Sequence, residues 1–399
     1  MQLPLQDVKV LDLSHALAGP FCSTMLADFG AQVIKIEPPG SGDISRGWGT
    51  VMPGGETEYF VGVHRNKQGI VLDLKSEAGK KLFLDLVAKA DIVLENFRVG
   101  TLDKLGLSYE VARKVNPGII YCSVSGFGLT GPYRDRPAMD LILQAESGMI
   151  SVTGEPGSRG VRAGVSIADL TAGMNAAYGI MLALRVKEKT GKGQVVDVSM
   201  MEGQIGLLGS MLTSYANSGA VPEPMGTAYK ALLPYQTFRT RTGDLAIAVG
   251  SDKLWKAFCP AMGCPELTDD PLFRTNADRN KNRPALLDKL QEVFLTKSYE
   301  EWEPILVKAG VPVGQVNKLS QIPDHPQVKA RNSLVTMEHP AVGKVTMGNV
   351  TVRLSETPGG VRTPSPRLGE HTAQVMKDML GLGDAQIAEL KGKGAFGKA

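Results

Sequence analysis

Val8-Lys9-Val10-Leu11-Asp12-Leu13 alternates apolar and polar side chains with a period of two, which predicts a β-strand. The residues from Phe21 to Asp28 predict a helix, with Pro20 as a natural first helical residue and Gly30 as a natural stop. Gln32-Val33-Ile34-Lys35-Ile36-Glu37 then predicts a second strand. A strand, a helix and a strand in this order form a unit whose two strands lie parallel.

The same alternation of strands and helices continues toward residue 199. Further strands are predicted at Ile70–Leu74, Ile92–Leu94, Ile119–Cys122 and Gln194–Ser199, and helices at Glu77–Ala90 and from about 168 to 189. Short apolar strands separated by helices favour a parallel sheet that is covered on both faces. We therefore predict an α/β fold with a Rossmann-like large domain.

From about residue 225 the pattern changes. Tyr235–Phe238 and Leu245–Val249 predict a hairpin, and helices are expected around 252–262, 284–297 and 299–309. Val345–Leu354 is β-like, and a last helix is expected near 371–381. These patterns predict a large α/β domain over residues 1–224, a smaller α+β domain over 225–330, and a C-terminal segment over 331–399 that returns to the large domain.

Composition and missing motifs argue against several classes of protein. The net charge of +3 over 399 residues is too small for a dedicated nucleic-acid binder. No leader and no apolar run near the roughly 20 residues of a membrane helix is visible, so we expect a cytoplasmic protein that makes no membrane contact. Four dispersed cysteines and five dispersed histidines predict no metal site. The turn after the first strand lacks GxGxxG, which argues against a dinucleotide site.

Seven short motifs follow one another between residues 8 and 372. They are Val10–Pro20, Gly30–Asp43, Asn66-Lys67 with Leu72–Lys75, Glu95–Arg98, Ser125–Gly128, Thr190–Gln194 and Leu368–Thr372. In this order they resemble the class III CoA-transferases, the family of formyl-CoA transferase and of the L-carnitine and bile-acid CoA-transferases. The pattern is most similar to members that use succinyl-CoA and dicarboxylates.

The resemblance implies an enzyme that moves coenzyme A from an acyl-CoA to a free carboxylic acid. CoA is then a substrate, and no tightly bound cofactor is expected. The resemblance also implies a homodimer, in which each chain forms an open ring that interlocks with the other.

Asp169 stands at the position of the family's nucleophile. Its place at the start of the predicted helix from about 168 to 189 favours a carboxylate, because unpaired backbone amides gather there. We therefore expect an ionised Asp169, although the same position suits a plain helix cap. Attack on the donor thioester would give a mixed anhydride, and the returning CoA thiolate would give an aspartyl-CoA thioester.

The resemblance also implies the residues that contact CoA. They are His15, Leu17, Ala18, Leu72, Asp73, Leu74, Lys75, Asn96, Phe97, Arg98 and Lys104, with Met139 and Asp140 as further lining residues. Some members carry a phosphate-binding arginine where this chain has Pro38, so Arg46, Arg65 or Lys75 is expected to replace it. For His15 a structural role is an alternative, and for each cation a solvated surface position is one.

Two other functions compete with CoA transfer. The related α-methylacyl-CoA racemases use a histidine and an aspartate to move a proton, but the histidine position is Met139 here, which cannot shuttle protons. A catalytically silent CoA-binding protein is the other alternative, and Asp169 within an intact motif argues against it. For a dicarboxylate substrate, Arg46 or Arg162 is expected to bind the second carboxylate.

Overall fold

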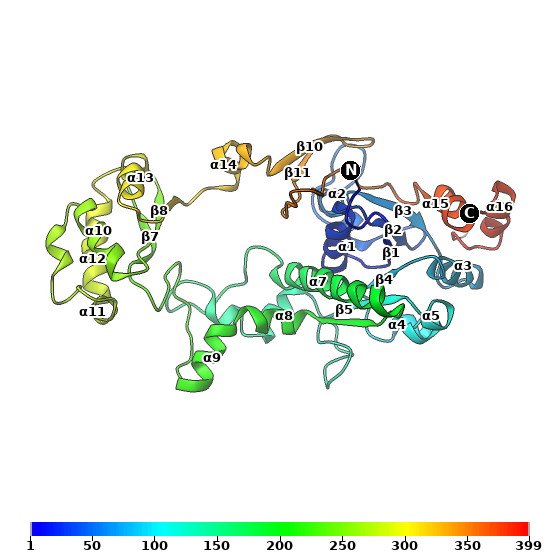
Figure 1. The fold of residues 1–399 in the computed structure, drawn as a ribbon, viewed down its shortest axis with the longest axis horizontal. Coiled ribbons are helices and arrows are strands. Elements are labelled where there is room, and N and C mark those ends of the chain that lie inside the picture. Colours follow the sequence, from blue (N-terminus) through cyan, green and yellow to red (C-terminus); the bar gives the residue numbers. More distant parts are fainter. Residues whose placement is uncertain (1, 398–399) are drawn as a thin grey trace. The chain divides into compact units, whose positions relative to one another are not determined.

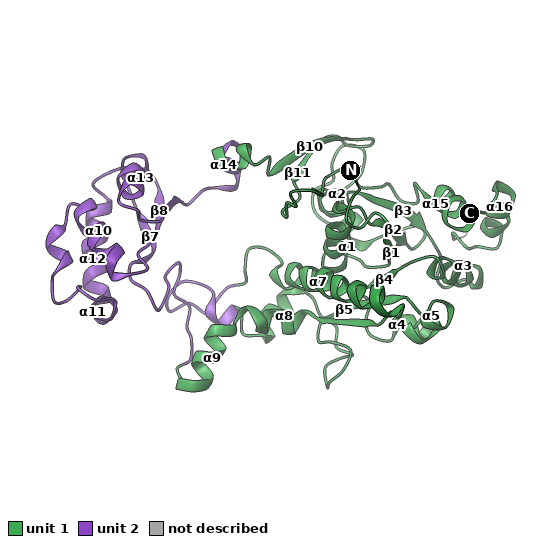
Figure 2. Cartoon of the chain, in the orientation of Figure 1, with its two compact units in different colours: residues 1–149, 162–220, 326–399 green, residues 150–161, 221–325 purple. Residues whose placement is uncertain are grey.

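A computed structural model describes residues 2–397, and Figure 1 shows the order of its helices and strands. The chain forms two compact units (Figure 2): unit 1 is Met1–Met149, Arg162–Ala220 and Pro326–Ala399, and unit 2 is Ile150–Val161 and Val221–His325. The predicted large domain over 1–224 wrongly included residues 150–161. This segment packs in unit 2 because the Gly226 amide donates to the Gly154 carbonyl at 2.7 Å.

A six-stranded parallel sheet forms the centre of unit 1. Its strands are β1 (Lys9–Asp12), β2 (Gln32–Glu37), β3 (Lys67–Val71), β4 (Ile92–Glu95), β5 (Ile120–Ser125) and β6 (Val195–Ser199). The strand order is β3-β2-β1-β4-β5-β6, and every pair is parallel. This is the Rossmann order, so the predicted α/β class is confirmed. The third strand begins earlier than predicted, because Gly69 interrupts its apolar run.

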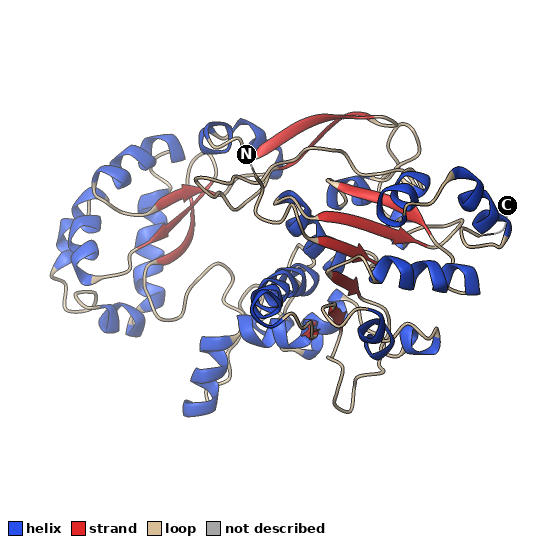
Figure 3. Ribbon diagram, turned by 45° about the vertical axis from the view of Figure 1, so that its right-hand side comes forward, coloured by secondary structure: helices blue, strands red, loops and turns tan. Residues whose placement is uncertain are grey.

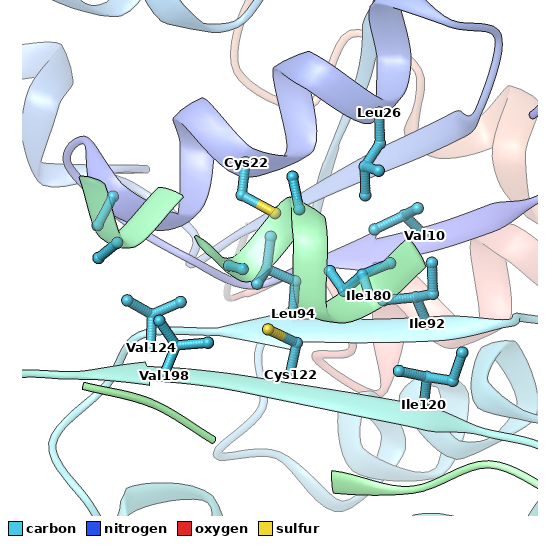
Figure 4. Packing of buried hydrophobic residues seen from close by; sticks show 14 of the residues in the cluster. Val10, Cys22, Leu26, Ile92, Leu94, Ile120, Cys122, Val124, Ile180 and Val198 are labelled. Atoms are coloured by element: carbon cyan, nitrogen blue, oxygen red, sulfur yellow. The ribbon is translucent and has the colours of Figure 1, made fainter. Parts of the chain in front are cut away.

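Helices cover both faces of this sheet. On one face, α1 (Ala18–Asp28) and α7 (Ile167–Thr190) pack on Val10 and the alternate residues of the neighbouring strands (Figure 4). On the other face, α3 (Glu77–Val87), α5 (Tyr109–Val115) and α15 (Thr372–Leu380) pack on Leu11 and its counterparts. Because successive strand residues point to opposite faces, both sets are buried. Cys22 and Cys122 point into the first core, and burial raises the pKa of both thiols.

By length and mean hydropathy, α7 is the one helix among residues 2–397 that meets the criteria for a membrane span. Its inner stripe of Ala168, Ala172, Ala176 and Ile180 is fully buried against α1 and the sheet. That is the arrangement of a core helix in a layered domain.

The rest of unit 1 consists of shorter elements outside the six-stranded sheet (Figure 3). They are η1 (Ile44–Gly47), α2 (Glu58–Val63), α4 (Thr101–Lys104), α6 (Asp140–Glu146), α8 (Met200–Leu207), α9 (Gly209–Ser218), α14 (Pro326–Ala330), β10 (Leu334–His339), β11 (Gly343–Gly348) and α16 (Asp384–Gly392). The segment after β11 runs back along β3, where the His371 amide donates to the Gly69 carbonyl at 2.8 Å. The predicted β-like stretch over 345–354 ends six residues early, at Gly348.

Unit 2 combines a three-stranded antiparallel sheet with helices. Its elements are η2 (Ile150–Val152), β7 (Tyr235–Arg239), β8 (Asp244–Ala248), α10 (Asp252–Ala261), η3 (Pro265–Thr268), α11 (Asn276–Lys281), α12 (Arg283–Phe294), α13 (Tyr299–Lys308), β9 (Val313–Gln315) and η4 (Leu319–Asp324). The predicted hairpin is β7–β8, and β9 adds a third strand that was too short to recognise. Trp255, Phe294 and Trp302 are fully buried in its core.

Candidate active site

The strand order of the large sheet reverses between β1 and β4, which lie side by side. In open parallel sheets, ligands bind in the crevice outside the carboxyl ends of the strands at such a point. The β1–α1 loop and the residues after β4 meet there: the His15 amide donates to Asn96 Oδ1 at 2.7 Å, and Asn96 Nδ2 donates to the His15 carbonyl at 2.8 Å. The rings of His15 and Phe97 lie 5.4 Å apart. Four predicted residues, His15, Ala18, Asn96 and Phe97, are thus brought to one place.

Asp169 joins this place from α7, in the first helical turn. The Ala18 backbone amide lies near its carboxylate and favours the ionised form. Gly173 lies one turn further on the same face, where a Cβ atom would come within 2.7 Å of the Ala18 carbonyl oxygen. The absence of a side chain at Gly173 therefore lets the amino ends of α1 and α7 touch, with the carboxylate of Asp169 against the amide of Ala18.

A plain capping role does not describe Asp169. The N-cap residue of α7 is Ser166, and the carboxylate that satisfies an amide of the first turn belongs to Asp140, whose Oδ1 accepts from Ala168 N at 2.9 Å. Asp140 Oδ2 accepts from Gln144 Nε2 at 2.7 Å, and both side chains are buried. Asp140, predicted only as a lining residue, thus fixes the start of α7.

The expectation of a fully ionised Asp169 is wrong. Burial and the neighbouring negative charge of Asp140 raise the pKa of Asp169 to about 7, although the Ala18 amide opposes the shift. The helix terminus favours the ionised form by a few tenths of a kcal/mol to about 1 kcal/mol, which is less than the penalty of burial. At neutral pH the group is therefore poised between its two states.

Two aromatic residues near Asp169 carry no sequence signal. Tyr59 lies on α2. Burial, and after it the negative charge of Asp169, raise the pKa of the Tyr59 phenol to about 12. Trp48 packs edge-on against Tyr59, with ring centroids 5.5 Å apart. Both residues lie in or beside a glycine-rich stretch over 47–57 that has no periodic pattern, and single aromatic residues there resemble ordinary packing residues.

The predicted CoA-contacting run after β3 has mixed roles. Leu72 is 1% exposed and belongs to the core, and Leu74 packs against it. Asp73 Oδ1 accepts from the Lys75 amide at 2.9 Å, which shapes the turn before α3. Lys75 has an exposed side chain at the carboxyl edge of the sheet. The strand that precedes this run, β3, lies two positions from β1 in the sheet.

Arg98 and Lys104 lie beyond β4 with exposed side chains. Arg98 borders a hollow of about 130 Å³ that also contacts Glu95 and Tyr121. Burial raises the pKa of Glu95 to about 7. A second hollow, of about 420 Å³, lies at the amino ends of β2 and β3 and is therefore separate from the switch point.

Two of the cations that were predicted to bind phosphate form ion pairs with carboxylates of the protein. Arg46 binds Glu37 through Nε at 2.7 Å and Nη2 at 2.8 Å, and it binds Glu56 at 3.0 Å. Arg65 binds Asp28 through Nε at 2.9 Å and Nη2 at 2.7 Å. These ion pairs satisfy much of the charge and donor capacity of both guanidinium groups, so the structure gives no support to Arg46 or Arg65 as a phosphate ligand or to Arg46 as a carboxylate ligand.

Arg162 has a different environment. Its Nη1 lies 3.9 Å from Asp140 Oδ2, and its side chain is 45% exposed. Since Asp140 also binds the amide next to Asp169, Arg162 brings a cation close to the nucleophile candidate. Within residues 2–397, no three His, Cys, Asp or Glu side chains gather to hold a metal ion.

Comparison with known proteins assigns the chain to a family. The model for CoA-transferase family III matches residues 5–372. Over 391 residues the chain is 39% identical to a succinyl-CoA–D-citramalate CoA-transferase of Chloroflexus aurantiacus, covering 98% of this chain and 97% of that protein. It is 37% identical over 391 residues to a succinyl-CoA:glutarate CoA-transferase of Homo sapiens, covering 98% and 89%.

A solved structure supports the same assignment. A CAIB/BAIF family protein from Brucella suis matches with a TM-score of 0.85 and 36% identity, over 95% of this chain and 100% of that one. The chain therefore belongs to CoA-transferase family III, and it is an enzyme that transfers coenzyme A between an acyl-CoA and a carboxylic acid.

Proposed function

We propose that Asp169 is the covalent relay of this transfer. Its carboxylate oxygen attacks the thioester carbonyl of the donor, the C–S bond breaks, and CoA thiolate leaves an aspartyl mixed anhydride. The thiolate then attacks the aspartyl carbonyl and releases the donor acid, which leaves an aspartyl-CoA thioester. The acceptor carboxylate reverses both steps. The observation that carries this proposal is the position of Asp169 against the Ala18 amide at the switch point.

The same amide has a second use in this scheme. When the aspartyl carbonyl is attacked, negative charge develops on an oxygen near the Ala18 N–H. A fixed backbone donor stabilises such charge without reorganisation. The partial burial of Asp169 also limits the access of water to the anhydride, which water would hydrolyse.

We also propose that donor and acceptor are dicarboxylates, with succinyl-CoA as a donor. The names of the two relatives above support this substrate class. Arg162 is the cation that supports it structurally, because it lies beside Asp140 and keeps an exposed side chain. A guanidinium group binds a carboxylate through two parallel hydrogen bonds, which suits the remote end of a dicarboxylate.

A panel of donors and acceptors tests the transferase and its substrates. Succinyl-CoA, acetyl-CoA and formyl-CoA are each combined with glutarate, citramalate, malate, oxalate and butyrate, and acyl-CoA products are measured by mass spectrometry. We expect succinyl-CoA with a dicarboxylate to be the fastest pair. Arg162→Met should raise the KM of the dicarboxylate about tenfold or more, because one charge-assisted pair is lost.

Arg113→Met provides the matched control, since this exposed arginine lies on α5 away from the switch point. Its kinetics should equal those of the wild type. A preference for butyrate over glutarate, or an unchanged KM in Arg162→Met, would contradict the dicarboxylate proposal. The absence of acyl-CoA exchange with every pair would contradict the transferase itself.

For CoA we propose a path along the carboxyl edge of the sheet, past the β1–α1 loop and the residues after β4. His15, Leu17 and Asn96 border this path at the switch point, and burial followed by Lys35 lowers the pKa of His15, which keeps its ring neutral. The exposed cations Lys75, Arg98 and Lys104 are the groups proposed for the phosphates. CoA enters and leaves with each turnover, and we propose no tightly bound cofactor.

We propose further that the chain acts as a cytoplasmic homodimer. One stripe of α7 is apolar and exposed on the chain: Met174, Tyr178, Met181, Leu182 and Val186 are each 43–67% exposed. An apolar patch of this kind marks a contact surface, and a second copy is the occupant that the family resemblance implies. Light scattering should give twice the 42.6 kDa of one chain, whereas a mass of 42.6 kDa would contradict the dimer.

The racemase alternative finds no support at the site. Met139 stands at the position of the second racemase base, and it is the N-cap residue of α6 with 62% of its surface exposed. A thioether does not accept and return a proton in this chemistry.

A further inference from the structure

The β1–α1 loop, which carries the Ala18 amide, is held by buried charges. Asp12, Lys35 and Asp43 are at most 1% exposed. Asp12 Oδ1 accepts from the Ser14 amide at 3.0 Å. Lys35 Nζ lies 2.9 Å from Asp43 Oδ2 and also donates to the Ser14 carbonyl. The buried ion pair of Lys35 and Asp43 therefore binds the backbone where the loop leaves β1.

The loop contains a conformation that must be held in place. Ala16 has a φ of 65°, in the left-handed region that residues with a Cβ rarely adopt. Asp43 Oδ1 accepts from the Ala16 amide at 3.1 Å, while the Lys35 ammonium binds the carbonyl two residues earlier. The two members of the ion pair thus hold the backbone at Ala16 and at Ser14, on either side of His15. An alanine in this region is strained, so its conformation persists only where neighbouring groups hold it.

Both members of the pair carry their charges. Burial alone would raise the pKa of Asp43, but Lys35 outweighs it and holds the pKa well below its usual range. Burial alone would lower the pKa of Lys35, but the carboxylates of Asp12 and Asp43 raise it. His64 Nε2 lies 3.8 Å from Asp43 Oδ2, and burial followed by Lys67 keeps its pKa well below the usual value, so it is neutral.

The backbone conformation of Ala16 determines where the next residues of the loop lie. Ala18 follows two residues later, at the start of α1, and its amide faces Asp169. We propose that Lys35 and Asp43 are positioning residues, which hold Ala16 in its left-handed conformation and thereby set the Ala18 amide against the carboxylate of Asp169. This inference rests on the proposed role of Asp169 as the nucleophile.

A buried ion pair is a poor device for stability alone. Removing two charges from water costs several kcal/mol, and apolar residues of similar volume often stabilise a core as well or better. The pair does what apolar residues cannot, because it donates to one backbone carbonyl and accepts from one backbone amide across a strained residue. This role depends on where the Ala18 amide lies. It is therefore tested by measuring the ionisation of Asp169, which that amide influences.

Two substitutions, Asp43→Asn and Lys35→Met, distinguish positioning from simple charge effects. The groups that face Asp169 are the Asp140 carboxylate and the Ala18 amide, with Tyr59, Arg162 and the pair itself beyond them. By charge alone, loss of the Asp43 anion would lower the pKa of Asp169, and loss of the Lys35 cation would raise it. A misplaced Ala18 amide raises the pKa of Asp169 in both variants.

The measurement is the pH profile of kcat/KM with the fastest donor and acceptor of the panel. The acidic limb reports the ionisation of the free nucleophile. We expect this limb to move upward by about one pH unit in both variants, and kcat to fall about tenfold, because the displaced Ala18 amide no longer favours the charged carboxylate. Limbs that move in opposite directions, or not at all, would overturn the inference.

Three further variants complete the test. Asp28→Asn removes the partner of Arg65 at the far end of α1, so it should lower Tm without moving the limb. Ala16→Gly placed in Asp43→Asn should restore part of kcat, because glycine adopts a φ of 65° without strain. If the charge variants do not fold, Ala16→Val tests the same point, and an unmoved limb there overturns the inference.

Failure of the proposed function looks different from failure of this inference. If Asp169→Asn retains CoA transfer, the nucleophile is wrong and the limb has no assigned meaning. If Asp169→Asn is inactive while Asp43→Asn and Lys35→Met behave like Asp28→Asn, only the positioning role is lost.

Discussion

Asp169→Asn is expected to abolish CoA transfer while the fold persists. The side-chain amide has the size of the carboxylate, and its oxygen can still lie near the Ala18 backbone amide. It cannot act as the attacking nucleophile, so kcat should fall by about three orders of magnitude or more. Intact-protein mass spectrometry after addition of acyl-CoA and hydroxylamine should detect an Asp169 hydroxamate in the wild type and none in the variant.

The stability of this variant gives a second, independent readout. The pKa of Asp169 is about 7 in the folded protein and 3.8 in a model peptide, so between these pH values the folded state holds a proton that the unfolded state has lost. Stability therefore falls as the pH rises through this window. The side chain of Asp169→Asn does not ionise, so its stability does not fall in this way. Its Tm should exceed that of the wild type at pH 8 but not at pH 4.

Glu77→Gln is the matched control, because Glu77 is an exposed carboxylate in the first turn of α3. It should transfer CoA at the wild-type rate. Wild-type activity in Asp169→Asn, with the fold intact, would contradict covalent catalysis by this residue.

The fold was predictable because its signals are local. The period-two strand beginning at Val8 and the alternation of strands and helices that follows are written in consecutive residues. The place of Asp169 in the first turn of a helix was also predictable, since the helix pattern begins there. The pKa of Asp169 was not predictable, because it depends on burial and on Asp140, which lies 29 positions away and meets it only in the folded chain.

The burial and pairing of charged residues could not be predicted from the sequence. Lys35 stands in an alternating strand, where a charged residue normally faces water, but both faces of β2 are covered and Lys35 is fully buried. The sequence also predicts Arg46 and Arg65 as free cations that could bind phosphate. Their partners, Glu37 and Asp28, are equally unremarkable in the sequence, and only the fold reveals that the charges cancel.

The second large effect is expected from Gly173→Ala. A Cβ atom at this position lies 2.7 Å from the Ala18 carbonyl oxygen and 3.0 Å from Phe21 Cδ1. A backbone oxygen cannot rotate away as a flexible side chain can, so α1 must move from α7. Such overpacking destabilises a core by about 1–3 kcal/mol, measurable by urea unfolding. The Ala18 amide moves with α1, and kcat should fall about a hundredfold, because small misplacements at a reacting group have effects of that size.

Gly392→Ala separates this steric effect from a general intolerance of alanine. Gly392 is helical, and a Cβ atom there meets nothing within 4 Å. Alanine should therefore leave kcat unchanged and stabilise the helix by up to about 1 kcal/mol. If Gly173→Ala unfolds at the wild-type urea concentration and keeps its kcat, the close approach of α1 and α7 does not place the nucleophile. If only its stability falls, the Ala18 amide is not required at its present distance from Asp169, and the covalent step must draw its stabilisation from another donor.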